Sequence, residues 1–230
     1  MKKVITLALL IAWIGMSTAN GQLNWSQCNT SNSETSGPSV VDCKSGGTYV
    51  CGSVNETATN GTAYFSPFVV NCLWTSSAFV AKKDAQGNTL WVRDLGRPTN
   101  LAYGNGYAYA NGITVDDSDN VYITGNFAGY IEIDSCTIIW SGVTTIDVFV
   151  IKYDKFGNVL WWKQFDCAGN AFGVGLKYMQ GNIYLLGEYF YQINVGTFSL
   201  GGTNLKSHAF LAKLSASDGE VSYATEAGGT

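Results

Sequence analysis

Hydrophobic and polar residues alternate along three similar stretches of the chain, which lie tens of residues apart. The middle stretch, Val148–Trp161, reads VFVIKYDKFGNVLW, the earlier one, Ala78–Trp91, reads AFVAKKDAQGNTLW, and Ala209–Tyr223 is a looser third copy. A period of two that is rich in β-branched and aromatic residues indicates β-strands. The return of one unit at this spacing indicates a repeat architecture.

Each copy predicts a β-hairpin. In the middle copy, the strand Val148–Asp154 ends in the turn Asp154–Gly157, and Val159–Phe165 is the return strand. Asp can cap its own turn, and Gly accepts the positive φ that such a turn needs at its end. The first copy repeats this turn at Asp84–Gly87.

A second pattern, x-Tyr-x-x-Gly, comes ahead of each hairpin. It occurs at Thr48–Gly52, Val121–Gly125 and Ile183–Gly187, and in the middle copy it is preceded by another strand-like segment, Ile113–Asp116. One repeat therefore holds about four strands. Four antiparallel strands form one blade of a β-propeller, so the predicted fold is all-β, with about three four-stranded blades in an incomplete ring.

The repeats are longer than those of the common propellers. The residues Phe79, Phe149 and Phe210, which occupy the same place in the three copies, are 70 and 61 residues apart, against about 40–50 for common propeller repeats. In the middle copy the surplus falls in Ala128–Ile146, where Tyr130–Ile133 predicts an extra hairpin arm.

The middle repeat carries a family resemblance. GITVDDSDNVYITGNF (Gly112–Phe127), followed by DVFVIKYDKFGNVLW (Asp147–Trp161), resembles the seven-bladed β-propeller repeat called SBBP, which is found in secreted bacterial proteins, often from Bacteroidetes. The resemblance extends over roughly Ser39–Thr230 and is weaker in the first and third copies. It implies a propeller scaffold, and it brings no catalytic motif.

The N-terminal segment has the pattern of a signal peptide, predicted at residues 1–21. Lys2 and Lys3 precede the apolar stretch Val4–Met16, and the small residues Ser17–Ala19 offer a cleavage site. The mature protein is then secreted or at the cell surface, with no membrane insertion after cleavage; a retained anchor is the alternative. Residues 22–38 are polar and predict a flexible leader. The blades are placed at about 39–97, 98–168 and 169–230.

Three blades do not close a ring, since propellers usually contain four to eight. Two interpretations lead. The chain is a fragment of a longer protein, or copies associate through open blade edges, because exposed strand edges pair readily with other chains. A compact stack that is not a propeller is a third interpretation.

Six cysteines follow the predicted signal peptide, an even number that suits disulfides in an oxidising compartment. Six cysteines can be connected by three disulfides in 15 ways. The two disulfides that we predict are Cys51–Cys72 and Cys28–Cys43. Alternatively, some are free and buried as small apolar residues. The full set is Cys28, Cys43, Cys51, Cys72, Cys136 and Cys167.

Asp116, Asp117 and Asp119 form the acidic cluster of the chain and are the candidate metal ligands, because carboxylates bind Ca²⁺. The cluster lacks the Gly and the closing Glu of an EF-hand loop, and it falls where a hairpin must turn. The sequence therefore predicts a structural turn here, with no metal and no cofactor.

Aromatic residues outside the repeated pattern are the candidate ligand-binding groups. Trp140, Tyr189 and Tyr191 could form a platform that stacks on a sugar. By contrast, Trp91 and Trp161 occupy equivalent repeat positions, which predicts packing between blades.

Catalytic residues are scarce. His208 is the single histidine, and the carboxylates Glu188, Asp134 and Asp166 near strand ends cannot be placed relative to one another, whereas glycoside hydrolysis requires two at a defined separation. The hairpin also distantly resembles the tryptophan-docking motif of quinoprotein dehydrogenases, although its turn is one residue shorter. A carbohydrate-active or quinone-dependent propeller enzyme is therefore the alternative function.

The net charge of −4 becomes −6 once Lys2 and Lys3 are removed, with 11 basic against 17 acidic residues. The sequence contains no basic patch, which disfavours nucleic acid as a partner. The predicted function is a secreted, non-catalytic propeller module that binds a protein or glycan partner.

Overall fold

The computed structural model describes residues 33–56, 61–72, 76–96, 106–134, 137–142, 144–201 and 206–228. Their regular structure is entirely β, and within these ranges no helix is long and apolar enough to cross a membrane. The predicted signal peptide at 1–21 lies outside the described residues, as do Cys28 and Cys136.

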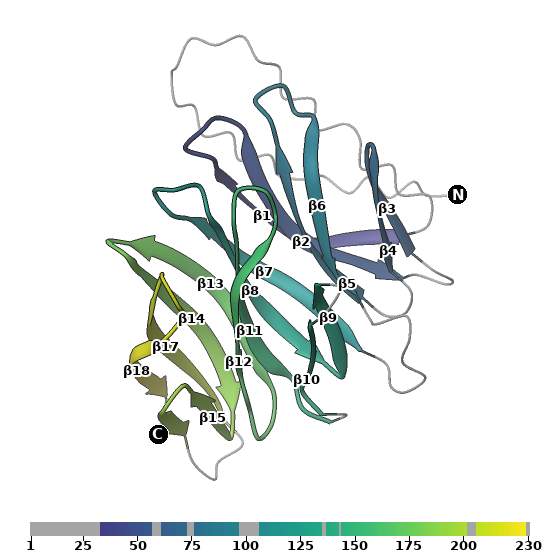
Figure 1. The fold of residues 1–230 in the computed structure, drawn as a ribbon. Coiled ribbons are helices and arrows are strands. Elements are labelled where there is room, and N and C mark those ends of the chain that lie inside the picture. The colour runs from purple at the N-terminus through teal and green to yellow at the C-terminus, as the bar shows by residue number, and fades with distance from the viewer. Residues whose placement is uncertain are drawn as a thin grey trace, which may run out of the picture.

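Three four-stranded antiparallel sheets follow one another along the chain and stack like vanes (Figure 1). In each sheet the strands are ordered as in the sequence. Blade 1 contains β1 (Ser33–Asp42), β2 (Thr48–Glu56), β5 (Ser76–Lys83) and β6 (Thr89–Leu95). Blade 2 contains β7 (Tyr107–Val115), β8 (Val121–Ala128), β11 (Asp147–Tyr153) and β12 (Val159–Phe165). Blade 3 contains β13 (Ala171–Met179), β14 (Asn182–Phe190), β17 (Ser207–Ser215) and β18 (Val221–Gly228). The predicted fold class, an all-β incomplete propeller, is confirmed.

Every blade also carries a two-stranded hairpin between its second and third strands. The sequence predicted this arm in the middle repeat alone. In blades 2 and 3 the hairpin is fastened to the blade before it, since Glu132 N donates to Gly96 O and Asn194 N donates to Asp166 O, both at 2.9 Å. The strands are β3 (Gly61–Phe65) with β4 (Phe68–Cys72), β9 (Tyr130–Asp134) with β10 (Thr137–Trp140), and β15 (Gln192–Val195) with β16 (Phe198–Gly201).

Blade 1 starts earlier than the sequence indicated. β1 begins at Ser33, inside the range 22–38 that was predicted as a flexible leader, and it pairs with β2 from Ser33↔Glu56 onward. A polar segment can join a sheet in this way because the ladder is made by backbone groups. The register shift between Ser36 and Ser39 accommodates Pro38, which has no N–H to donate.

A recurring close contact explains the x-Tyr-x-x-Gly pattern. In blade 2 the glycine, Gly125, is paired with Phe149 on the neighbouring strand, and a Cβ on Gly125 would lie 2.9 Å from Cζ of that ring. In blade 3 a Cβ on Gly187 would lie 2.5 Å from Cζ of Phe210. In these two blades the phenylalanine of the repeated hairpin therefore lies over the glycine of the neighbouring strand, and a larger side chain would displace the ring.

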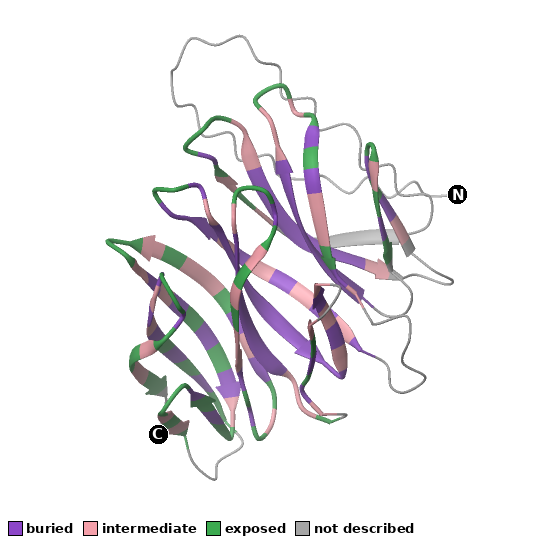
Figure 2. Cartoon of the chain, viewed as in Figure 1, coloured by how far each residue is buried: buried purple, intermediate pink, exposed green. Residues whose placement is uncertain are grey.

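The core is built between blades. One cluster of buried residues joins blades 1 and 2, and includes Leu95, Phe127 and Phe149; another joins blades 2 and 3, and includes Val150 and Phe210. Figure 2 shows the consequence: buried positions fill the two central strands of blade 2, β8 and β11, whereas exposed positions alternate along the strands of blade 3. The middle blade is thus the one that is covered on both faces.

The described cysteines are not paired. Cys43, Cys51 and Cys167 are buried free thiols, so the structure forms neither Cys51–Cys72 nor Cys28–Cys43. Cys51 lies in the cluster that faces blade 2, whereas the β3–β4 hairpin that contains Cys72 packs on the opposite face of blade 1. Burial raises the pKa of Cys51 to about 12 and that of Cys43 to about 11, so both thiols stay protonated at neutral pH.

Candidate functional site

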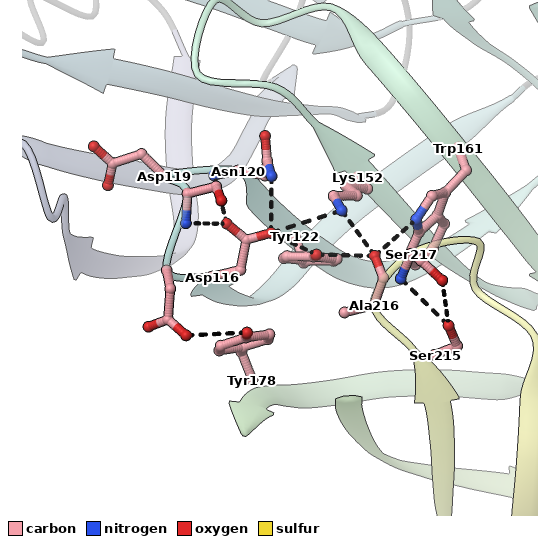
Figure 3. Close-up of polar contacts among 12 residues, drawn as sticks. Asp116, Asp119, Asn120, Tyr122, Lys152, Trp161, Tyr178, Ser215, Ala216 and Ser217 are labelled. Carbon is pink, nitrogen blue, oxygen red and sulfur yellow. Dashed lines mark hydrogen bonds and ion pairs between the residues drawn. The ribbon is translucent and has the colours of Figure 1, made fainter. Parts of the chain in front are cut away.

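A row of three side chains fastens blade 2 to blade 3. Tyr122 on β8, Lys152 on β11 and Trp161 on β12 lie side by side across the sheet. Lys152 Nζ and Trp161 Nε1 donate hydrogen bonds to one backbone carbonyl, Ala216 O, at 2.8 and 3.3 Å, and the Tyr122 hydroxyl oxygen lies 3.1 Å from the same carbonyl (Figure 3). We call such a tyrosine, lysine and aromatic set a donor row, and the sheet face that bears it the forward face.

Asp116 completes this contact. Its Oδ2 accepts a hydrogen bond from the Tyr122 hydroxyl at 2.9 Å and lies 3.6 Å from Lys152 Nζ. Burial disfavours the carboxylate, but hydrogen bonds from Asn120 and Tyr122 outweigh it and hold the pKa of Asp116 below its ordinary value. The donor row therefore surrounds a buried ion pair, which is costly to break from one side.

Blade 1 binds blade 2 in the same way. Its donor row is Tyr49, Lys82 and Trp91, again in register across the sheet. Lys82 Nζ and Trp91 Nε1 donate to Lys155 O at 3.3 and 3.0 Å, and the Tyr49 hydroxyl donates to Asp119 O at 2.9 Å. In both rows the lysine Nζ lies 5.0 Å from the centroid of the tyrosine ring. The predicted blade packing of Trp91 and Trp161 corresponds to these contacts.

The candidate metal ligands separate in space. Asp116 caps the turn that the sequence predicted, accepting from Ser118 N and Asn120 N at 2.9 Å. Asp119 accepts from backbone N–H groups of blade 1, including Ser45 N at 2.9 Å, and Asp117 accepts from the Tyr178 hydroxyl at 3.2 Å. Within the described ranges, no group of three or more His, Cys, Asp and Glu side chains is arranged to hold a metal ion.

The predicted aromatic platform is not assembled as one surface. Trp140 is 52 % exposed and stacks on Tyr130, while Tyr191 is 38 % exposed. Tyr189 is fully buried, with its ring packed against Phe210, so the structure does not present it on one surface with Trp140 and Tyr191. The alternation along β14 turns Tyr189 toward the core between blades 2 and 3, where its hydroxyl donates to Glu226. Binding by Trp140 and Tyr191 stays a prediction.

A pocket of about 470 Å³ lies where the innermost strands of blades 2 and 3 meet. It combines aromatic, amide and carboxylate groups, and its volume is in the range of small-ligand sites. The lining residues that matter most are Tyr107, Tyr109, Asn111, Asn126, Phe172 and Glu188.

The polar wall of this pocket is set by a bulge. Asn111 is the extra residue in β7, between Ala110 and Gly112, and its Nδ2 donates to Asn126 Oδ1 at 3.0 Å and to Gly173 O of blade 3 at 2.9 Å. Tyr107 and Tyr109 meet edge to face with ring centroids 5.6 Å apart. Burial, followed by the neighbouring Tyr109, raises the pKa of Tyr107, which therefore stays neutral.

Sequence reasoning noticed Glu188 but missed the rest of the pocket. Tyr107, Tyr109 and Asn111 precede the repeated patterns, and only the stacking of blade 3 on blade 2 brings Phe172 to them. The closely spaced tyrosines Tyr103, Tyr107 and Tyr109 were the available signal. Of the other predicted carboxylates, Asp166 accepts from Gln164 Nε2 at 3.0 Å, and His208 is nearly buried against Tyr189.

Comparison with known proteins gives a distant relative. The chain is 28 % identical over 120 residues to an uncharacterised WD repeat-containing protein of Acanthamoeba polyphaga mimivirus. The match spans 50 % of this chain but 8 % of that protein. No protein-family model matches the chain. The relative agrees with a propeller-type repeat and leaves its role to be argued from the site.

Proposed function

We propose that this chain is a non-catalytic β-propeller repeat module, of the SBBP type, that binds a glycan in the pocket between blades 2 and 3. The observation that carries the proposal is the lining of that pocket, in which Tyr107, Tyr109 and Phe172 offer apolar ring surface beside Asn126 and Glu188. Sugar rings present both C–H faces and hydroxyl groups, which aromatic and polar side chains bind together.

A binding role is favoured over hydrolysis by the charges around this pocket. Among its lining residues Glu188 is the single carboxylate, whereas glycoside hydrolysis uses a pair of carboxylic residues at a fixed separation. The WD repeat-containing relative supports the same interpretation at the level of a scaffold. A protein partner bound at the rim of the blades is the alternative within this role.

Binding of the purified chain to an oligosaccharide panel, followed by calorimetry with the strongest binder, tests the proposal. Tyr109→Ala and Glu188→Ala should each weaken binding about tenfold or more, because one removes ring contact and the other an acceptor for sugar hydroxyls. Trp140→Ala serves as the control, since Trp140 lies outside the pocket. A loss of binding in Trp140→Ala alone would move the site to the β9–β10 hairpin, and no binding at millimolar concentration would refute the proposal.

We further propose that the protein is exported. The support is the basic and apolar pattern of residues 1–21. Expression of the full chain with a C-terminal tag, followed by fractionation and N-terminal sequencing, should give an extracytoplasmic protein that begins after Ala19 or Gly21. An intact Met1 in the cytoplasmic fraction would contradict export.

A further inference from the structure

Blade 3 has a donor row with nothing bound to it. Tyr184 on β14, Lys213 on β17 and Tyr223 on β18 are in the same cross-strand register as the rows of blades 1 and 2. Tyr184 and Lys213 are partly exposed and Tyr223 is 49 % exposed, and among the described residues none of these side chains makes a hydrogen bond or ion pair. Blade 3 thus has the counterparts of the three side chains that bind a backbone carbonyl in the other blades, but no carbonyl of the described residues is bound to them.

The apolar surface beside this row is also uncovered. Leu186 and Leu211, which pair across β14 and β17, are 48 % and 39 % exposed. The positions equivalent to them in blade 2, Thr124 and Val150, are completely buried by blade 3. The forward face of blade 3 therefore has the composition of an interface between blades.

Blade 1 has the complementary rear face, but its own β3–β4 hairpin packs on that face, where Phe79 and Ala81 are buried, so only part of it is open. Between blades 1 and 2 the accepting carbonyl is that of Lys155, and between blades 2 and 3 it is that of Ala216. Each of these residues is the second residue of the turn that connects the third strand of its blade to the fourth. The equivalent residue in blade 1 is Ala85, which is exposed. On the same rear face, Val40 is 54 % exposed, although its equivalent Ile113 packs against the core between blades 1 and 2.

We propose that the forward face of blade 3 binds the exposed part of the rear face of blade 1, at Val40 and Ala85, in a second copy of this chain. Tyr184, Lys213 and Tyr223 hold the carbonyl of Ala85 of that copy, and Leu211 covers its Val40 region. The contact repeats the geometry between successive blades, so it is head-to-tail and continues the existing stack. Two copies joined through both faces combine six of the described blades, a number within the range of closed propellers.

Sedimentation velocity of the full chain in reducing buffer tests this proposal across a concentration series. The wild-type chain should change from monomer to dimer as concentration rises. Lys213→Glu, on the forward face, and Val40→Asp, on the rear face, should each weaken association at least tenfold. Leu160→Asp is the matched control, because Leu160 is 50 % exposed even though blade 2 has a neighbour on both sides. Circular dichroism confirms that each variant is folded.

The variants on the forward face of blade 3 and on the rear face of blade 1 distinguish a head-to-tail dimer from other modes of association. In a head-to-tail dimer both variants weaken binding, and mixing Lys213→Glu with Val40→Asp restores one intact interface and some hetero-association. An effect of Lys213→Glu without one of Val40→Asp would indicate that two blade 3 faces meet each other, which overturns the proposal. A wild-type chain that stays monomeric at about 100 μM would also overturn it.

Discussion

The donor rows of blade 2 and blade 3 have the same register and nearly the same residues, but they differ in what covers them. Lys152 is 8 % exposed and binds Asp116 and Ala216 O, whereas Lys213 is partly exposed and binds neither an anion nor a carbonyl in the described structure. Val150 is completely buried, and its equivalent Leu211 is 39 % exposed. The sheet itself therefore does not bury the row; the next blade does, so stability should be shared between neighbours, as in other repeat proteins.

The largest expected difference is between the two lysines. Lys152→Ala leaves the Asp116 carboxylate buried without its cation and should cost about 3 kcal/mol of unfolding free energy. Lys213→Ala should change it by less than about 0.5 kcal/mol, measured where the chain is monomeric. Chemical denaturation followed by circular dichroism gives both values. Equal losses would show that the row stabilises its own sheet.

Exchanging the aromatic residues of the two donor rows, Trp161 in blade 2 and Tyr223 in blade 3, tests the same difference between a covered and an uncovered row. Trp161→Tyr gives blade 2 the row of blade 3, and it should cost about 2 kcal/mol because it removes apolar contact and the Nε1 donor to Ala216 O. The reverse change, Tyr223→Trp, should be neutral in the monomer. Thermal unfolding scans of both variants provide the measurement, and a destabilised Tyr223→Trp would argue against an open forward face.

A pH series separates two carboxylates at the blade 2–3 boundary. Burial raises the pKa of Asp147 to about 6, and it accepts from Cys167 N at 2.9 Å. Because its pKa is higher in the folded state, the folded chain holds the proton more tightly, and stability should fall by about 1 kcal/mol between pH 4 and pH 6.5, a figure reduced for solvent screening. Asp147→Asn should flatten this slope in equilibrium denaturation.

Asp116 should act in the opposite direction and in another pH window. Its pKa is lowered in the folded state, so the stability it contributes is present above about pH 4 and is lost as the pH falls through its folded value. Lys152→Ala should reduce this acid-induced loss, whereas Lys213→Ala should leave it unchanged. An acid transition identical in both variants would separate Asp116 from the donor row.

The smallest expected effect concerns the exposed edge of the same boundary. Tyr178→Phe removes the hydroxyl that donates to Asp117 at 3.2 Å. Since this contact is exposed to solvent, the loss should be about 0.5 kcal/mol or less. A melting temperature lowered by more than a few degrees would show that this contact is part of the buried network.

The sequence predicted what repeats. Period-two strands, the Asp-to-Gly turns and the three equivalent phenylalanines led to the correct fold class, because each depends on local backbone geometry. The sequence did not predict the hairpins of blades 1 and 3. Their strands, at Thr62–Phe65 and Gln192–Val195, have only a short alternation of polar and apolar residues in common with Tyr130–Ile133, so no repeated sequence pattern marks them. β1 was shortened because backbone pairing recruits polar residues that no hydrophobic pattern marks.

The site was harder to predict because it arises between blades. Tyr189 looked available in the sequence, but the register of β14 turns it inward. Asp116, Asp117 and Asp119 are close in sequence, yet Asp116 binds within blade 2, Asp117 contacts blade 3 and Asp119 contacts blade 1. Conversely, Tyr109 and Phe172 are far apart along the chain and meet at one pocket. No spacing rule within a single repeat contains this information.

The carbonyl at the centre of each donor row has a consequence for how such chains can diverge. Every amino acid supplies the same C=O, and the residues that present it here are as different as Lys155 and Ala216. Mutations in the presented residue therefore leave recognition by the preceding unit intact. A module built on this principle can be duplicated, reordered or recombined with foreign modules, and the joint between them survives the loss of sequence similarity.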